Sequence, residues 1–132
     1  MLYSRAQSTS GPRRVVVTGC GMVTPLGLGV AANREGFRTG QTAFRPVTLF
    51  DVSRQRVHTA AEVNLPGALP VALTPRQAQL LDRAGRMLLW AAHEATEQAR
   101  WDSQQTARCV AGTTGGGMSH GETYFRTAIR EP

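Results

Sequence analysis

The sequence of 132 residues contains no lysine, only two cysteines and no long apolar run. Its apolar stretches fall well short of the roughly 18 consecutive residues that span a bilayer, so no membrane-spanning helix is expected. All 15 basic residues are arginines, and they are scattered along the chain. A nucleic-acid-binding surface usually gathers basic residues in clusters with interleaved aromatics, so the net charge of +6 predicts no nucleic-acid partner. An acidic protein partner remains compatible with that charge.

The two cysteines, Cys20 and Cys109, lie far apart and form no metal-binding spacing. Residues 1–12 lack the apolar core of a secretory signal, so we expect a flexible leader, a cytoplasmic location and reduced thiols. A nucleophilic cysteine needs a nearby cation or helix N-terminus and a histidine within reach. Cys109 is expected in a buried strand as a packing residue. Cys20, at a strand end, is the better candidate, but no histidine partner is assured, so both are interpreted as structural.

The apolar pattern predicts alternating strands and helices, which is typical of an α/β protein with helices packed against a sheet. The long alanine-rich helix is expected to let another backbone approach closely, with Glu94 and Gln98 on its polar surface. A threonine followed by proline at residue 75 is typical of a helix start. Residues 41–57 show no periodicity and are expected to form a loop. The predicted strands cover residues 15–18, 58–63 and 109–111, and the predicted helices cover 30–39, 82–100 and 118–129, with another starting at 75.

Two glycine-rich segments invite a phosphate-binding interpretation. In the first, Gly19 and Gly21 follow a predicted strand, but Thr24 stands where a dinucleotide-binding motif needs its third glycine, and Pro25 interrupts the helix. The second, residues 115–117, lacks the lysine and hydroxyl residue that complete a phosphate-binding loop. For residues 115–117 we therefore favour a turn that needs positive φ and room for a neighbouring backbone, and for the first segment nucleotide binding is disfavoured.

The remaining polar residues give no catalytic pattern. The three histidines, His58, His93 and His120, show no metal-ligand spacing and are interpreted as surface or hydrogen-bonded side chains. Asp82 and Glu122 have no paired carboxylate, so general acid–base chemistry is unsupported. No metal, cofactor or catalytic residue is predicted from these residues.

The opening run at residues 13–27, RRVVVTGCGMVTPLG, resembles the start of the β-ketoacyl-acyl carrier protein synthases, the condensing enzymes of fatty-acid and polyketide synthesis. The resemblance runs to about Ala128. Its further features follow in family order: Phe50-Asp51, Ala61-Glu62-Val63, the alanine-rich helix led by Asp82, and the strand that enters residues 112–117. The resemblance implies that residues 13–132 form an incomplete N-terminal part of a thiolase-like fold, with layers in the order αβαβα.

Members of this family perform a decarboxylative Claisen condensation with a cysteine nucleophile and two histidines, and need no cofactor. In the family pattern those residues lie after Pro132, and Cys20 stands where relatives usually carry an aliphatic residue. The resemblance thus implies the N-terminal segment of a 3-oxoacyl-[acyl-carrier-protein] synthase, inactive on its own. The alternative is a naturally short, non-catalytic split or degenerate subunit that partners another chain. Either one implies a completing polypeptide, and the whole enzyme implies an acyl carrier protein partner and a homodimer.

Two functional positions of the family fall inside this chain. Thr114, Gly115 and Gly116 match the segment that lines the end of the acyl-chain pocket. Many relatives carry a bulky residue at Gly115, so the resemblance implies a deeper or differently opened pocket here. Arg76 matches the basic helix entry that relatives present to the acidic carrier protein. The following turn, residues 77–80, carries no other basic residue.

Overall fold

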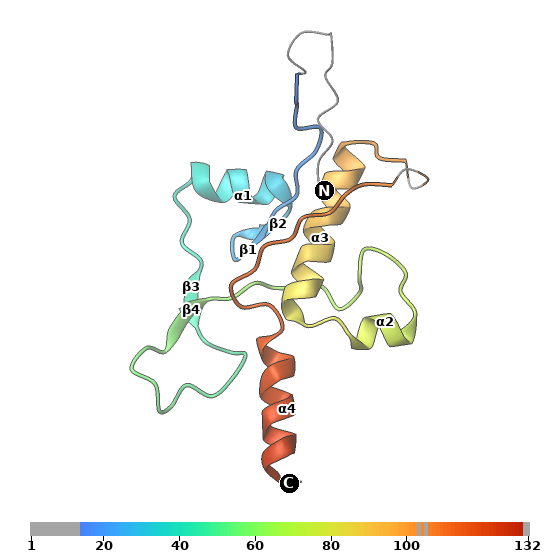
Figure 1. The fold of residues 1–132 in the computed structure, drawn as a ribbon. Helices are drawn as coiled ribbons and strands as arrows, with labels where there is room; N and C mark the ends of the chain where they lie inside the picture. Colours follow the sequence, from blue (N-terminus) through green and yellow to red (C-terminus); the bar gives the residue numbers. More distant parts are fainter. Residues whose placement is uncertain (1–13, 103, 105, 131–132) are drawn as a thin grey trace.

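A computed structural model describes residues 14–102, 104 and 106–130; the leader expected at residues 1–12 lies outside this part. Strands β1 and β2 form one antiparallel hairpin and strands β3 and β4 another, so the described residues hold two small sheets. Figure 1 shows α3 near the middle of this arrangement, while α4 projects away from it. The fold is therefore mixed α/β. In chain order the elements are β1 (Val23–Thr24), β2 (Gly27–Leu28), α1 (Gly29–Arg38), β3 (Phe44–Pro46), β4 (Thr59–Ala61), α2 (Pro75–Gln79), α3 (Arg83–Gln98) and α4 (Met118–Arg130).

The predicted strands at residues 15–18 and 109–111 are wrong for this structure. Both segments lie in extended stretches without strand pairing. Val15 is 94% exposed and Val110 is 98% exposed, so neither segment is covered on a face. β-Branched residues favour an extended backbone, but a strand also needs a neighbour that accepts its hydrogen bonds, and neither segment is paired within the described residues.

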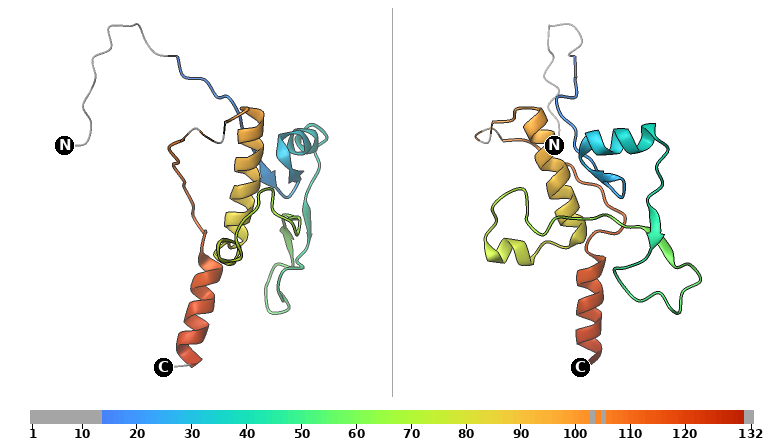
Figure 2. Two further views of the ribbon diagram at one scale, coloured as in Figure 1. Left: turned by 90° about the vertical axis from the view of Figure 1, so that its right-hand side faces the viewer. Right: turned by 180° about the vertical axis from the view of Figure 1, so that it is seen from behind.

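The described residues contain no fully buried hydrophobic side chain. The accessible surface of the chain is 11902 Å², whereas a compact protein of 14.2 kDa exposes about 6,800 Å². Figure 2 shows the same openness from two further sides, with α4 standing clear of the hairpins. Local hydrogen bonds and close backbone contacts therefore hold this arrangement together more than a hydrophobic core does.

The segment at residues 19–22 lies directly on the backbone of α3. A Cβ atom added at Gly21 would lie 1.8 Å from the carbonyl oxygen of Ala91, and one at Gly19 would lie 2.1 Å from that of Ala95. Neither distance leaves room for any side chain, so both positions require glycine. The expected close approach to the alanine-rich helix is confirmed, and the two glycines serve that packing.

Two polar side chains of α3 hold this segment in place, although the sequence predicts them on the polar surface. Gln98 Oε1 accepts a hydrogen bond from the Cys20 amide at 2.7 Å, and Glu94 Oε2 accepts one from the Met22 amide at 2.9 Å. Glu94 Oε1 also accepts from the Val30 amide at 2.7 Å. The last bond supplies α1 with a negative charge at its N-terminus, where its own N-cap, Leu28, offers no side-chain acceptor.

The one fully buried side chain among the described residues is Asn33, which is 1% exposed. Its Nδ2 donates to the carbonyl oxygens of Gly27 at 3.0 Å and Gly29 at 2.7 Å, and its Oδ1 accepts from the Thr24 hydroxyl. Asparagine is a weak helix former, but here every polar atom of the side chain has a partner. Asn33 thus joins α1 to the β1–β2 hairpin.

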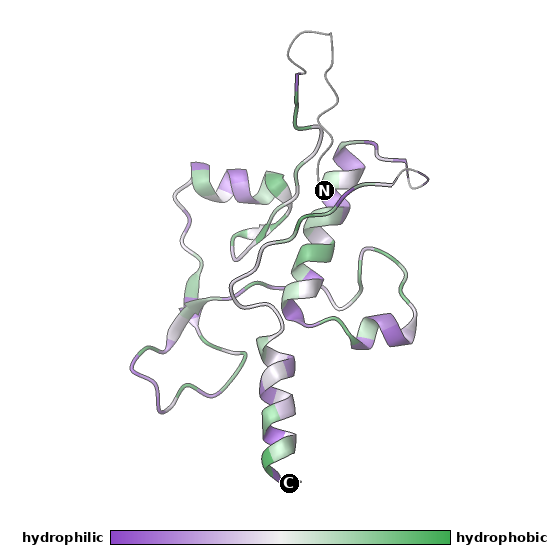
Figure 3. Cartoon of the chain, in the orientation of Figure 1, coloured by the Kyte–Doolittle hydropathy of each residue, from purple (hydrophilic) through white to green (hydrophobic). Residues whose placement is uncertain are grey.

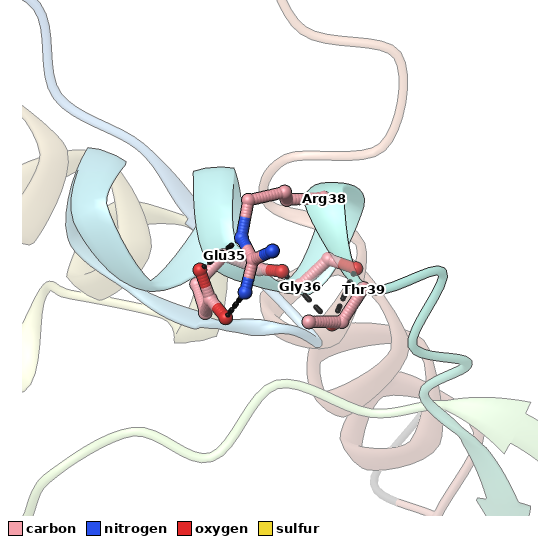
Figure 4. Close-up of polar contacts among 4 residues, drawn as sticks. All are labelled: Glu35, Gly36, Arg38 and Thr39. Atoms are coloured by element: carbon pink, nitrogen blue, oxygen red, sulfur yellow. Dashed lines mark hydrogen bonds and ion pairs between the residues drawn. The ribbon is translucent and has the colours of Figure 1, made fainter.

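The end of α1 is shown in Figure 4. Arg38 Nη2 contacts Glu35 Oε1 at 2.6 Å, and this partner holds the pKa of the Glu35 carboxyl below its ordinary value. The Thr39 hydroxyl donates to the Glu35 carbonyl oxygen at 2.9 Å. Gly40 then adopts a φ of 65°, which confirms the predicted glycine stop of this helix.

The second hairpin confirms one prediction and corrects another. β4 lies inside the edge strand predicted at residues 58–63, whereas β3 lies in the stretch predicted as loop. The register pairs Phe44 with Ala61 and Pro46 with Thr59. Just after β4, Glu62 is 8% exposed, and its carboxylate accepts from the Thr48 amide and hydroxyl and from the Leu49 amide. The Thr48 hydroxyl is the main cause that keeps the pKa of Glu62 below its ordinary value.

We predict that Gly21→Ala destabilises the fold. The new methyl group meets helix backbone, which cannot rotate away as a side chain can, so residues 19–22 must move off α3. Overpacking of this kind costs about 1–3 kcal/mol. Gly67→Ala is the control, because a Cβ there meets nothing within 4 Å. Thermal unfolding and hydrogen exchange at the Met22 amide measure the effect; equal melting of the two variants would contradict the packing role of Gly21.

Candidate functional site

The glycine-rich segment at residues 112–117 lies against the start of α3. The two parts enclose a hollow of about 250 Å³. Gly116, one of the three residues predicted for the acyl pocket, lines this hollow directly. The full lining is Asp82, Ala84, Gly85, Leu88, Ala111, Gly112, Thr113 and Gly116.

Glycines within the segment differ in the room they leave. The Thr113 hydroxyl accepts from the Gly116 amide at 2.8 Å, and a Cβ at Gly116 would meet the same oxygen at 2.8 Å. At Gly115 the nearest atom to an added Cβ is Met118 Sδ at 3.5 Å, which is an ordinary contact. A side chain added at Gly115 therefore fits, whereas one added at Gly116 would crowd the Thr113 hydroxyl. The predicted positive φ occurs at Gly117, where it is 82°.

Asp82 binds both sides of the hollow. As the N-cap of α3 it accepts a hydrogen bond from the Gly85 amide through Oδ1 at 2.7 Å. Its Oδ2 accepts from the Gly117 amide, also at 2.7 Å. These two bonds, with a smaller contribution from nearby His120, keep the pKa of Asp82 below its ordinary value. The carboxylate is therefore held in its charged form between the helix and the glycine-rich segment.

Arg76 lies on α2, the short helix whose predicted start at Pro75 is confirmed. Thr74 and Gln77 form a reciprocal capping box at its N-terminus. Arg76 is exposed, and within the described residues it makes no hydrogen bond or ion pair. Figure 1 shows α2 beside the lower end of α3, while the glycine-rich segment leads into α4. Arg76 and the glycine-rich segment thus lie on different elements, both near the N-terminal end of α3.

The cysteines and histidines form no catalytic group in the part of the chain that the structure describes. Cys109 is exposed, which overturns its expected role as a buried packing residue, because the strand predicted around it is unpaired. Cys20 is exposed as well. His93 lines a second hollow, of about 280 Å³, together with Trp90 and Glu94. Across residues 14–102, 104 and 106–130, His, Cys, Asp and Glu side chains form no group of three that could hold a metal ion.

Sequence reasoning missed the residues that organise this site. It treated Asp82 as an isolated acid, although an aspartate directly before a helical run is a signal for an N-cap. The bond to Gly117 has no such signal, since its partner lies 35 residues away.

None of the helices described is long and apolar enough to cross a membrane.

Comparison with known proteins identifies the class to which this fold and site belong. The family model for the N-terminal domain of β-ketoacyl synthases matches residues 12–131. The chain therefore belongs to the β-ketoacyl synthase family, a family of acyltransferases. This match confirms the resemblance seen in residues 13–128.

The relatives come from polyketide and fatty-acid synthesis. The chain is 37% identical over 90 residues to the tetracenomycin polyketide synthase ketoacyl synthase alpha subunit of Streptomyces glaucescens, covering 68% of this chain and 21% of that protein. It is 43% identical over 51 residues to 3-oxoacyl-[acyl-carrier-protein] synthase 2 of Coxiella burnetii, covering 39% of this chain and 12% of that protein. The chain thus spans about a fifth of the first relative's length. No solved structure matches it significantly.

Proposed function

We propose that this chain supplies the N-terminal part of a 3-oxoacyl-[acyl-carrier-protein] synthase that lengthens acyl chains by decarboxylative Claisen condensation. The observation that carries the proposal is the family match over residues 12–131. In the reaction, an acyl group is held as a thioester on the enzyme. A malonyl group on the carrier loses carbon dioxide, and its carbanion attacks the thioester carbonyl and releases the thiolate. The described residues offer no thiol with a histidine partner, so further polypeptide supplies these groups.

Exposed apolar side chains support a role within a larger body. Figure 3 shows apolar stretches along the extended segments and on α4. Large apolar residues at such exposure usually mark a surface that packs against another part of a protein. We propose that the rest of the synthase covers them and that the layered thiolase-like fold forms on that contact. The exposed residues concerned are Val15, Val16, Val17, Val110, Met118, Tyr124, Phe125 and Ile129.

The same surface also suits the second candidate, a short non-catalytic subunit that completes or scaffolds another chain. Both candidates bury the extended segments and α4, so the structure of this chain does not separate them. They differ in whether the completing polypeptide is covalently continuous with residues 1–132 and in whether the assembly condenses acyl groups.

The test is the intact mass of the native gene product, followed by a condensation assay with acyl and malonyl carrier proteins. The proposed synthase predicts a mass several-fold above 14.2 kDa and release of carbon dioxide with a lengthened acyl product. A 14.2 kDa product that co-purifies with a second chain and adds no activity to it would favour the non-catalytic subunit. A stable, monomeric 14.2 kDa product without activity would contradict both candidates.

For the acyl pocket, we place the end of the chain-binding site at Thr114, Gly115 and Gly116. Gly115→Ile in the assembled synthase is expected to shift preference to shorter acyl chains. The added side chain has room at its Cβ and takes up space beside the hollow. Gly67→Ile, on a loop before α2, is the matched control. An unchanged ratio of kcat/KM values for long and short acyl carriers would contradict this assignment.

For the acyl carrier protein, we place part of the docking surface at Arg76. Arg76→Glu is expected to raise KM for the acyl carrier about two- to fivefold at low salt, because it replaces attraction to an acidic partner with repulsion. The effect should shrink as salt rises. Arg34→Glu is the control, since Arg34 is an exposed arginine on α1. An equal rise in KM for a small acyl thioester without carrier would argue against docking.

A further inference from the structure

We propose that Asp82 is a positioning residue, which fixes the glycine-rich segment at residues 112–117 against α3 and so sets the end of the acyl pocket. This inference rests on the function proposed above. It concerns specificity and does not place Asp82 among the catalytic residues.

The two oxygens of the Asp82 carboxylate accept hydrogen bonds from two different parts of the chain. Oδ1 accepts from the Gly85 amide in the first turn of α3, and Oδ2 accepts from the Gly117 amide, each at 2.7 Å. Capping a helix needs only one acceptor, which serine or asparagine supplies about as well as aspartate. The second oxygen is what the carboxylate adds, and its partner lies 35 residues further along the chain.

The partner residue makes this second bond structurally important. Gly117 has a φ of 82°, a conformation that glycine adopts without strain, and its carbonyl oxygen accepts from the Gly121 amide at the start of α4. The bond to Asp82 therefore fixes both the end of the glycine-rich segment and the beginning of α4. His120, in that first turn, adds electrostatic attraction to the carboxylate.

The segment has little else to hold it. The bond between Thr113 and Gly116 is internal, and an added Cβ at Gly112 or Gly117 would meet nothing within 4 Å. Among the described residues, the Gly117–Asp82 bond is the hydrogen bond that ties residues 112–117 to α3. Because Gly112, Thr113 and Gly116 line one side of the hollow and Asp82 the other, loss of this bond loosens the wall.

The test compares Asp82→Asn with Asp82→Ser in the assembled synthase. Both variants keep an N-cap acceptor for Gly85. In Asp82→Asn, the side-chain oxygen accepts from the Gly85 amide, so the side-chain NH2 group faces the Gly117 N–H and cannot accept from it. In Asp82→Ser, the single hydroxyl caps the helix, and no second acceptor is left for the Gly117 amide. Hydrogen exchange over residues 113–118 is expected to rise about tenfold in both, the factor that corresponds to one ordinary hydrogen bond. Asp51→Asn is the control, because within the described part of the chain Asp51 accepts only from Ser53 in its own turn.

The activity readout is the acyl-chain profile. We expect KM for longer acyl carriers to change severalfold relative to shorter ones, with kcat for the preferred chain within twofold of the parent value. Asp82→Asn combined with Gly115→Ile should give a non-additive shift, since both act on the same wall. If Asp82 served only as the helix cap, Asp82→Ala would lower the stability of the protein. Asp82→Ser would then leave both the hydrogen exchange of residues 113–118 and the acyl-chain profile unchanged.

The outcomes separate this inference from the proposed function. Unchanged exchange in Asp82→Asn and Asp82→Ser overturns the positioning role, whatever the activity. Faster exchange with an unchanged chain profile, in an enzyme whose profile Gly115→Ile does shift, overturns the role in specificity and leaves the proposed function standing. An assembly that cannot condense acyl groups overturns the proposed function, and the exchange result alone then decides whether Asp82 holds the segment.

Discussion

The structure depends on one close contact, where residues 19–22 lie on the backbone of α3. Gly19 and Gly21 make the contact possible because neither leaves space for a Cβ against the helix. Once the backbones are this close, Glu94 and Gln98 reach the amides of Met22 and Cys20. Small residues and long polar side chains thus alternate along one helix face, since positions three and four apart share a face. The second oxygen of Glu94 accepts from the Val30 amide in the first turn of α1, so one carboxylate of α3 holds both this segment and the start of α1.

A consequence is that the best-buried side chains are polar. Asn33 and Glu62 are the buried polar side chains among the described residues, and each satisfies several backbone or hydroxyl partners at once. Such groups stabilise a local conformation only while every partner is in place, because an unsatisfied buried polar atom is costly. The apolar residues lie exposed on the extended segments and on α4. The chain therefore has well-defined local contacts and an exposed apolar surface, and apolar surface of this kind usually packs against another part of a protein.

Helices could be predicted from the sequence because their signals are local. The alanine spacing and the glycine at position 40 predict α1 and α3 to within about two residues at each end. Strands could not be predicted as well, since pairing depends on a neighbour distant in sequence: residues 15–18 have the right composition and no partner, whereas β3 has weak composition and pairs with β4. The site shows the same limit. The glycine-rich segment could be singled out from its motif, but the partners of Asp82 and Glu94 lie 35 and 72 residues away.

α3 connects the two glycine-rich motifs. Near its C-terminal end, Gln98 and Glu94 accept hydrogen bonds from the amides of residues 20 and 22. At its N-terminus, the N-cap Asp82 accepts one from the amide of Gly117. Each motif thus presents backbone N–H groups to carboxylate or amide oxygens of one helix or of its N-cap. Glycine suits both places, for close approach in the first motif and for positive φ in the second. Because both motifs bond to the same helix or its N-cap, the position of α3 bears on where each of them lies. The composition of the helix follows these contacts: alanine stands where residues 19–22 come closest, Asp82 caps the N-terminus, and Glu94 and Gln98 lie near the C-terminal end.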